Sequence, residues 1–534
     1  MTQAGGGDPL IMANMIRAKA QTLPDLDVLT FVEVKPDGSL ADETRTYRQL
    51  WDRGRQLAKA LEARGLKKGE HFALLMQNHP EFVEAMIAAS ILGAVFVPID
   101  PRTKGEKLVY MLKFAECRGA VAADYALANL LEVLPGLPAM GFIAVMGGMK
   151  DVPARDDRFF PLADAFAGPV PEMEVRSADP AAPMQLLFTS GTTGDPKAIV
   201  AAHRRFVESG ALARIVGLKD DDRPYTGLSL THANAQLISL GMILNNGLRG
   251  VVSRKFTKTR LWDITRAYGC TTFNLLGGMT VEIYSMPEKP NDADNPVRMV
   301  LSAGMPAAIW EKFAKRFDVQ IQELYGAAEG GFTINPPGVG PIGSVGKPLP
   351  GSELAILDDE GNRVPAGTPG EICFRPVGGA AQVRYLKNEG ASGKKTEGGW
   401  LHTGDIGHVD ENGWLFFHHR KGGEIRRNGD FINPAFVEKA VAEHPHVADV
   451  FVYGVPAKSG APGEKDVVAA VVPEDMKAFD AASVFAHCRR ALEANMVPSY
   501  LQVVAEIPKT ASEKPQERFL RETLKEGAPN VFTP

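Results

Sequence analysis

A loop of small hydroxylated residues and glycines follows an apolar stretch in the first half of the chain. The segment LLFTSGTTGDPKAIV occupies residues 186–200, and Lys197 comes shortly after the glycines. Glycines let backbone N–H groups approach an anion closely, the hydroxyls donate further hydrogen bonds, and the lysine neutralises negative charge. Because the GxxxxGK[ST] spacing of the Walker loop is absent, we predict a phosphate-binding loop of another kind.

This loop is too specific to be an ordinary surface loop. Loops rich in Ser, Thr and Gly are common, but the pattern TSGTTGxPK fixes eight positions. At a generous frequency of about 7% for each residue, a random match arises roughly once in a billion start positions. We therefore treat the loop as functional.

The loop TSGTTGDPK resembles the phosphate loop of adenylate-forming enzymes, which include acyl-CoA synthetases, luciferases and the adenylation domains of peptide synthetases. The likeness extends from about Thr46 to Arg521 and is greatest to acid–CoA ligases. Two short stretches, VPID at 97–100 and VPSY at 497–500, also resemble carnitine/crotonobetaine-type CoA ligases. The other motifs in family order are YGAAE (325–329), GEI (370–372), WLHTGD (400–405), Arg420 followed by NGD (428–430), and PKTASEK (508–514).

The resemblance implies an ATP site. In the superfamily, ATP and a carboxylate first give an acyl-adenylate and pyrophosphate. Lys197 and the loop before it would hold the β- and γ-phosphates. Glu329 and Thr192 would place Mg²⁺ on phosphate oxygens, the hard ligands that this ion prefers. Asp405, as an ionised carboxylate, would accept hydrogen bonds from the ribose hydroxyls. With the adenine-binding stretch and the second ribose contact included, the implied ATP-binding residues are Thr189, Ser190, Gly191, Thr192, Thr193, Gly194, Lys197, Ala303, Gly304, Met305, Tyr325, Gly326, Ala328, Asp405 and Arg420.

Three residues carry the implied catalytic roles. Lys514 would bridge the substrate carboxylate and the α-phosphate, because a cation between two approaching anions lowers the barrier. Glu329 would act through Mg²⁺, and His232 would stand at the mouth between the acyl group and the thioester site. Taken singly, charged residues such as Glu329 and Lys514 are ordinarily solvated surface groups. Their place in ordered motifs reverses that interpretation.

The sequence departs from the family pattern at four positions. Ala328 stands where Thr is usual, and loss of a hydroxyl near the α-phosphate would cost about 1 kcal/mol or more of hydrogen bonding. Glu513 replaces the glycine before Lys514, and its charge would favour the protonated lysine. Ala198 replaces another glycine, and Pro515 is unusual. A catalytically degenerate nucleotide-binding relative therefore stays open as an alternative.

The resemblance also implies a second half-reaction, in which the thiol of coenzyme A attacks the acyl-adenylate. The C-terminal domain would rotate about a hinge at Lys421 and Gly422, where a glycine tolerates wide backbone changes. Gly429 and Asp430 would line the pantetheine channel. Four basic residues are either CoA-phosphate ligands or solvated surface charges: Arg426, Arg427, Lys458 and Lys465.

The implied acyl pocket contains several polar residues. Thr231, Asn234 and Gln236 are costly to bury unless they bond a polar group of the substrate. Bonds to each other or to the backbone are an equal alternative, because most side-chain bonds go to backbone or water. The substrate is expected to be a small to medium carboxylic acid, with a polar substituent as one option. The implied pocket residues are His232, Asn234, Asn274, Gly277, Gly330 and Gly331.

A free-standing adenylation enzyme that loads a carrier protein is a further alternative. The segment LLGGMT at 275–280 lacks the serine that an attachment site requires, so no carrier is expected within the chain. Activity with free CoA separates this alternative from an acid–CoA ligase.

The elements that must position these residues change along the chain. A helical pattern at 46–66, an apolar strand at 71–77, a helix at 81–92 and a strand at 94–100 predict a parallel sheet covered by helices. After Gly343, short strands separated by Gly-rich turns suggest a more antiparallel, barrel-like part. We expect an α/β fold with a large N-terminal domain, residues 1–420, of two α/β subdomains and a distorted β-barrel. A small mobile α+β domain, residues 421–534, would carry the catalytic lysine.

Composition excludes several classes. The chain has 534 residues and a net charge of −5, which argues against broad nucleic-acid or anionic-membrane binding. Its four cysteines lie far apart, so a disulfide framework is not expected and a cytoplasmic location fits best. The N-terminus lacks the pattern of a signal peptide. The most apolar run, 85–98, is too short for a bilayer and predicts a buried helix and strand. The sequence leaves a homodimer open.

Overall fold

The computed structural model describes residues 7–189, 196–421, 425–427, 430–432, 434–458, 465–492, 494–510 and 515–534. The chain packs into two compact units. The first consists of Met1–Gly343 and Gln382–Lys395, and the second of Ser344–Ala381 and Thr396–Pro534. The domain boundary predicted at 420/421 falls within the second unit and stays a prediction.

The first unit contains a seven-stranded sheet that begins near the N-terminus. Its strands are parallel except for β8 and β9, which pair antiparallel. The strands predicted at 71–77 and 94–100 are confirmed as β3 and β4. In spatial order the sheet is β7 (Phe159–Pro161), β6 (Phe142–Met146), β5 (Cys117–Ala123), β3 (His71–Leu75), β4 (Val95–Pro98), β8 (Pro183–Phe188) and β9 (Ala198–Ala202).

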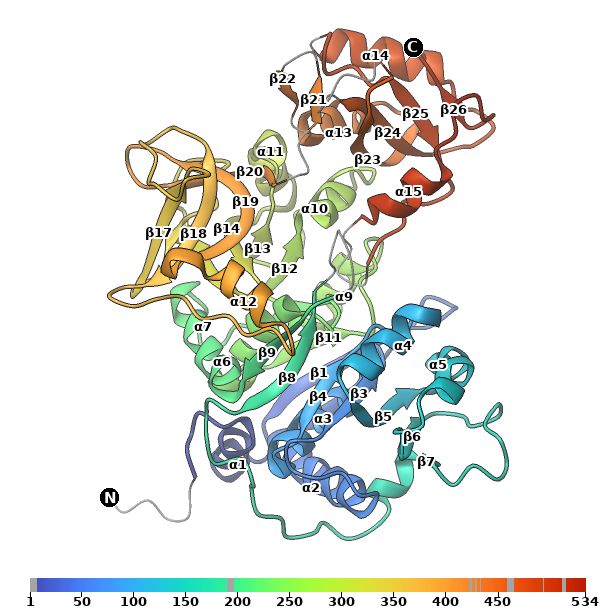
Figure 1. Ribbon diagram of the computed structural model, residues 1–534, viewed down its shortest axis with the longest axis vertical. Helices are drawn as coiled ribbons and strands as arrows, with labels where there is room; N and C mark the ends of the chain where they lie inside the picture. Colours follow the sequence, from blue (N-terminus) through green and yellow to red (C-terminus); the bar gives the residue numbers. More distant parts are fainter. Residues whose placement is uncertain are drawn as a thin grey trace. The chain divides into compact units, whose positions relative to one another are not determined.

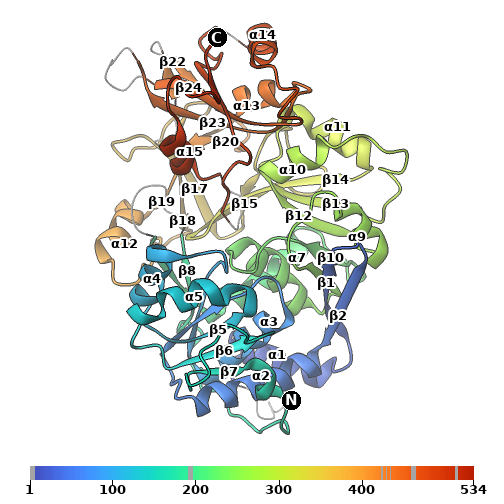
Figure 2. The ribbon, with the colours of Figure 1, turned by 90° about the vertical axis from the view of Figure 1, so that its right-hand side faces the viewer.

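Helices cover both faces of this sheet (Figures 1 and 2). Successive side chains of a strand point to opposite faces. Accordingly, Phe72 and Leu74 of β3 join the core under α2 (Tyr47–Ala63) and α3 (Pro80–Leu92), with α1 (Met12–Thr22) nearby. Ala73 and Leu75 join the core under α4 (Gly105–Phe114) and α5 (Leu127–Val133). The apolar run 85–98 is therefore a buried helix and strand, as predicted.

Local sequence sets the ends of α2 and α3. Thr46 and Gln49 form a capping box at the start of α2, which satisfies two backbone donors that the helix leaves unpaired. Pro80 begins α3, and Gly93 ends it with φ of 67°. Both helices match the predicted ranges.

The other sheet of the first unit carries most of the predicted site. Its central strands are parallel, and β2 and β15 pair antiparallel at the two sides. In order the strands of this unit are β15 (Gly330–Ile334), β14 (Gln320–Ala327), β13 (Met299–Ala303), β12 (Thr272–Leu276), β10 (Pro224–Thr226), β11 (Gly250–Ser253), β1 (Asp27–Val34) and β2 (Leu40–Thr46). The associated helices are α6 (His203–Glu208), α7 (Leu212–Ile215), the π-helix η5 (Asn234–Gly241), α8 (Met242–Asn246), α9 (Leu261–Tyr268), α10 (Gly277–Tyr284), α11 (Ala307–Phe317) and α12 (Glu389–Lys395).

The second unit is richer in antiparallel strands, as the Gly-rich turns after Gly343 predict. One four-stranded antiparallel sheet consists of β17 (Ser352–Leu357), β18 (Gly370–Pro376), β19 (Leu401–Val409) and β20 (Leu415–Arg420), and the short strand β16 (Lys347–Pro348) precedes it. A ribbon of β21 (Ile425–Arg427) and β22 (Asp430–Ile432) follows. The last sheet is β23 (Val447–Pro456), β24 (Lys465–Pro473), β25 (Tyr500–Val503) and β26 (Val531–Phe532), with helices α13 (Pro434–Ala442), α14 (Ala481–Ala491) and α15 (Glu517–Thr523).

These elements confirm the predicted α/β class. Among the helices that the described residues form, none combines the length and the apolar character needed to cross a bilayer.

Candidate active site

The ends of the predicted phosphate loop are held together by β8 and β9. Phe188 pairs with Ala198 in the antiparallel register, and the backbone N–H of Thr189 donates to the carbonyl of Lys197 at 2.8 Å. The loop therefore leaves and re-enters the sheet at neighbouring points. Ser190, Gly191, Thr192, Thr193 and Gly194 lie outside the described residues.

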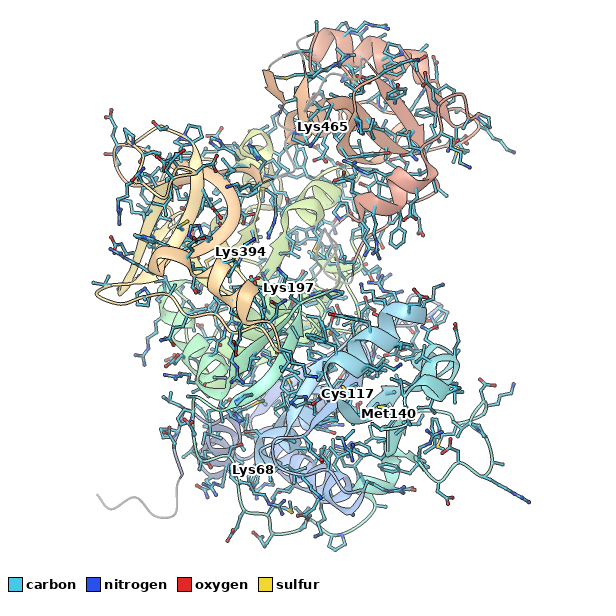
Figure 3. The ribbon with its side chains drawn as sticks, viewed as in Figure 1. Lys68, Cys117, Met140, Lys197, Lys394 and Lys465 are labelled. Carbon is cyan, nitrogen blue, oxygen red and sulfur yellow. The ribbon has the colours of Figure 1, made fainter. Side chains whose placement is uncertain are left out.

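Lys197, labelled in Figure 3, stands directly before β9 and faces an aromatic residue that the motif analysis did not include. The segment of residues 384–386 pairs with β9, because the N–H of Leu386 donates to the carbonyl of Ala198 at 2.9 Å and Ile199 bridges Tyr385. This pairing brings the Tyr385 ring centroid to 5.6 Å from Lys197 Nζ. An ammonium over an aromatic face is attracted by the ring quadrupole.

Tyr385 also binds Glu329. Its hydroxyl donates to Glu329 Oε1 at 2.7 Å, and its side chain is buried. Glu329 sits in the turn between β14 and β15, where Gly330 and Gly331 have φ of 141° and 73°, conformations that favour glycine. Lys197, Tyr385 and Glu329 therefore form one chain of contacts within the first unit.

The oxygen chemistry of Glu329 suits Mg²⁺. This ion is usually held by one or two carboxylates together with substrate phosphates, and Glu329 lies with Lys197 around one tyrosine. The second predicted metal ligand, Thr192, lies outside the described residues. The part of the donor set that is described fits the ion.

The predicted adenine segment lies at the ends of two neighbouring parallel strands. Ala303 ends β13, and Tyr325, Gly326 and Ala327 end β14. The carboxyl ends of parallel strands meet at one edge of a sheet, which is where α/β proteins bind ligands. Ala303, Gly304, Met305, Tyr325, Gly326, Ala328 and Glu329 are thus brought together there.

A buried carboxylate that the motifs did not indicate supports this edge. Glu323 of β14 accepts hydrogen bonds from the backbone N–H groups of Gly304 and Met305, the latter at 3.1 Å. Burial raises the pKa of Glu323 to about 7. Because Gly304 has φ of 110°, a conformation that the two bonds help to fix, Glu323 shapes the predicted adenine segment.

The polar residues of the predicted acyl pocket bond to one another. Asn274 of β12 donates to the side chain of Asn234, and Ser239 donates to Asn274 Oδ1 at 3.0 Å. Gln236 Nε2 donates to the Leu230 carbonyl at 2.6 Å. These contacts agree with the alternative in which the polar side chains bond to each other or to the backbone rather than to a substrate.

The other residues of the predicted acyl pocket lie in turns and at the starts of elements. His232 lies in the turn before η5, and its backbone N–H donates to the Ser229 carbonyl at 3.1 Å. Gly277 begins α10 directly after β12, and Gly330 and Gly331 begin β15. The predicted pocket residues therefore come from a turn, one π-helix, two strands and the start of one helix. Turns of π-helix often occur at functional sites.

In the second unit, the predicted ribose pair lies across two strands. Asp405 of β19 pairs in register with Arg420 of β20, and Asp405 Oδ1 is 3.4 Å from Arg420 Nη1. Asp405 is 7% exposed, so its carboxylate is largely shielded from water. The two residues expected to contact ribose are thus neighbours.

The GEI segment holds the turn before Asp405. Glu371 accepts a hydrogen bond from the Gly404 N–H at 2.9 Å and contacts His402 Nδ1 at 3.1 Å. Gly404 has φ of 77°, which favours glycine. Lys421, half of the predicted hinge, donates its backbone N–H to Gly404 and its ammonium to Asp359 at 2.8 Å.

The remaining predicted residues belong to segments that the structure describes in part. Gly422, Gly429 and Lys514 lie outside the described residues, as does Glu513. Asp430 begins β22 and pairs with Arg427 of β21. Lys509 and Pro515, on either side of residues 511–514, form an antiparallel bridge.

Two family models match the chain. A family model described as AMP-binding enzyme matches residues 16–381, and one described as AMP-binding enzyme C-terminal domain matches residues 437–514. The chain belongs to the AMP-binding enzyme family. The predicted family and the predicted class, an AMP-forming acid–thiol ligase, are confirmed.

The chain is similar to several CoA ligases. The chain is 30% identical to the medium/long-chain-fatty-acid–CoA ligase FadD17 of Mycobacterium marinum, over 88% of this chain and 89% of that protein. It is 27% identical to the crotonobetaine/carnitine–CoA ligase of Salmonella paratyphi C, over 88% and 91% of the two chains. The crystal structure of the anthranilate CoA ligase AuaEII with anthranoyl-AMP matches with a TM-score of 0.82 and 24% identity, over 96% of each chain.

Proposed function

We propose that this chain is an ATP-dependent ligase that joins a small to medium carboxylic acid to coenzyme A. In the first step a carboxylate oxygen attacks the α-phosphorus of ATP, and the P–O bond to pyrophosphate breaks. In the second step the CoA thiol attacks the acyl carbon, the bond to AMP breaks, and the thiol proton is lost. The observation that carries the proposal is the contact chain Lys197–Tyr385–Glu329 beside the phosphate loop.

The described residues suit the first step. Lys197 supplies positive charge at the end of the phosphate loop, where ATP brings its negative charge. Glu329 would hold Mg²⁺, which neutralises phosphate charge when bound, and the Tyr385 hydroxyl fixes one oxygen of that carboxylate. Asp405 accepts hydrogen bonds from ribose, with Arg420 beside it.

The proposal assigns the second step to the C-terminal part of the chain. Residues 421–534 act as a mobile domain that turns about Lys421 and Gly422. Lys514 stabilises the meeting of carboxylate and α-phosphate before the turn, and Gly429 and Asp430 line the CoA channel after it. The match of a C-terminal family model to residues 437–514 supports a separate domain there.

The acyl pocket favours an acid whose recognition does not depend on many polar contacts. Asn234, Ser239 and Asn274 use their side chains on each other, which leaves fewer donors for the substrate. Within the described residues, Gln236 Oε1 has no hydrogen-bond partner although the side chain is fully buried. One donor on the acyl group, such as a hydroxyl, would satisfy it.

The proposed setting is the cytoplasm, with no nucleic-acid partner. The four cysteines are buried and free of disulfides, as expected in a reducing compartment. Homodimer formation is tested by the mass of the enzyme in solution.

Pyrophosphate release tests the proposal directly. It is measured with short, hydroxylated, aromatic and betaine-type acids, with and without CoA, for the wild type, Lys514→Ala and the control Lys525→Ala, whose lysine is exposed. We expect release with one class of acid, thioester only when CoA is present, and loss of both in Lys514→Ala but not in Lys525→Ala.

Two other outcomes would contradict the proposal. ATP binding without pyrophosphate release for any acid would indicate the degenerate nucleotide-binding alternative. Release of pyrophosphate with transfer only to a carrier protein, and never to free CoA, would indicate a carrier-loading enzyme.

A further inference from the structure

An arginine lies beside the predicted site without a role in any of the motifs. Helix α6 begins directly after β9, so one short strand connects the phosphate loop to this helix. His203 and Phe206 of α6 are fully buried and fix the helix against the core, whereas Arg204 is exposed. Arg205 is only half-buried, and its Nη2 donates to the carbonyl of Ala328 at 2.6 Å.

The residue that Arg205 contacts, Ala328, belongs to a cluster of apolar side chains from several elements of the predicted site. Ala328 packs with Leu187 of β8, Ile199 of β9 and Tyr385, the same tyrosine that binds Glu329. Ala233, the residue before the π-helix of the acyl pocket, belongs to the same cluster. Arg205 therefore contacts the residue before Glu329, and that residue packs against the strands that flank the phosphate loop.

The guanidinium of Arg205 has unused donors. It carries five N–H groups, and within the described residues its one hydrogen bond is that to Ala328, with no carboxylate within ion-pair distance. Burial lowers the pKa of Arg205, and the charge of Glu329 opposes that shift. A partly buried cation that no carboxylate contacts directly is costly, and an anion that binds beside it relieves the cost.

We propose that Arg205 binds a reactant oxyanion beside residue 328 in the adenylation step. This inference rests on the proposed function. The guanidinium fork fits a carboxylate or a phosphate with two parallel hydrogen bonds. Ala328 has only a methyl group at this point, so Arg205 supplies the hydrogen-bond donor that the side chain at 328 lacks. The oxyanion belongs either to the α-phosphate of ATP or to the carboxylate of the acid.

Three variants test the role. Arg205→Gln keeps an N–H donor for the Ala328 carbonyl but removes the charge, and Arg205→Lys keeps the charge but not the fork. Arg204→Gln is the matched control, because its side chain is exposed on the same helix. For each variant, ATP binding is measured by calorimetry without acid, KM for ATP and for the acid are measured by pyrophosphate release, and the melting temperature is recorded.

We expect Arg205→Gln to weaken either ATP binding or the kcat/KM for the acid by about 10- to 100-fold, the range for a charge-assisted hydrogen bond. Arg205→Lys should recover part of the loss, and Arg204→Gln should match the wild type. A change in ATP binding without acid assigns the oxyanion to phosphate, and a change confined to the acid assigns it to the carboxylate.

The inference is wrong if Arg205→Gln keeps the wild-type values for both substrates. It is also wrong if Arg205→Gln and Arg205→Lys both lose substrate binding to the same extent and both melt at a clearly lower temperature than the wild type. Failure of the proposed function is recognised separately. In that case the wild type itself releases no pyrophosphate, and the calorimetric comparison of Arg205→Gln with Arg204→Gln still decides whether Arg205 binds the nucleotide.

Discussion

At the scale of single residues, Tyr385 links two charges that ATP chemistry needs. Its ring lies near Lys197 and its hydroxyl donates to Glu329, so it holds a cation and an anion apart by one side chain. In the proposed function, these two charges serve phosphate and metal, and Tyr385 contacts both.

We expect Tyr385→Phe to keep the ring and lose the bond to Glu329. Removal of a hydrogen bond to a charged group costs about 1.5–3 kcal/mol, which corresponds to a fall of roughly 10- to 100-fold in kcat/KM. The Mg²⁺ concentration that gives half-maximal pyrophosphate release should rise, because the carboxylate is no longer oriented. A variant with wild-type Mg²⁺ dependence would exclude this role.

Several residues of the site could be predicted from the sequence, and others could not. Glu329, Asp405 and Arg420 occupy fixed places in ordered motifs. The structure connects Glu329 to Lys197 through Tyr385 and puts Asp405 beside Arg420. Arg205 and Glu323 are charged residues whose burial arises only from tertiary packing. Nothing in their local sequence separates them from the solvated charges that are the usual case.

At the scale of elements, the strands β13 and β14 depend on a buried carboxylate. Burial raises the pKa of Glu323 from 4.5 to about 7, so the folded protein holds this proton more tightly than the unfolded chain does. The stability that the proton contributes is fully present below pH 4.5 and is lost as the pH rises through about 7. Glu438 in the second unit behaves in the same direction, with a pKa of about 7.

We therefore expect the wild type to lose more stability than Glu323→Gln between about pH 5 and pH 8. At about 1.4 kcal/mol per pKa unit the difference is at most about 3 kcal/mol. Melting temperatures of both proteins at the two pH values measure it, since unfolding of two units need not be two-state. Parallel pH dependence of the two proteins would contradict the assignment.

Helices α2 and α3 make a close contact that only glycine allows. A Cβ at Gly54 would lie 2.5 Å from Ile87 Cγ2, whereas a Cβ at Gly136 meets nothing within 4 Å. We expect Gly54→Ala to lower stability by about 1–3 kcal/mol through overpacking, partly offset by about 1 kcal/mol of helix propensity. A lower melting temperature for Gly54→Ala than for Gly136→Ala is the expected result. Equal values would show that the helices move apart freely.

Single helices and strands could be predicted from the sequence better than the packing of distant segments. The helix at 46–66 and the strand at 71–77 follow from local periodicity and end signals, and the structure confirms both. The packing of residues 382–395 with the first unit does not follow from any local pattern. These residues are surrounded in sequence by strands of the second unit, and their partner β9 lies almost two hundred residues away.

At the scale of the whole molecule, this segment decides where the chain can be shortened. A fragment that ends at residue 420 keeps the segment 384–386 that pairs with β9, whereas one that ends at residue 381 loses it together with Tyr385. We expect the longer fragment to melt at a clearly higher temperature and to bind ATP, and the shorter one to expose apolar surface around Ile199. Equal melting temperatures would show that the segment adds nothing to the fold.

The same path of the chain sets how many backbone connections join its parts. The backbone passes between the two units three times, after residues 343, 381 and 395. Beyond residue 420 the backbone stays in the second unit and does not return to the first. If residues 421–534 turn as the proposed domain, the rotation passes through one backbone connection, because the chain has no later return to the first unit.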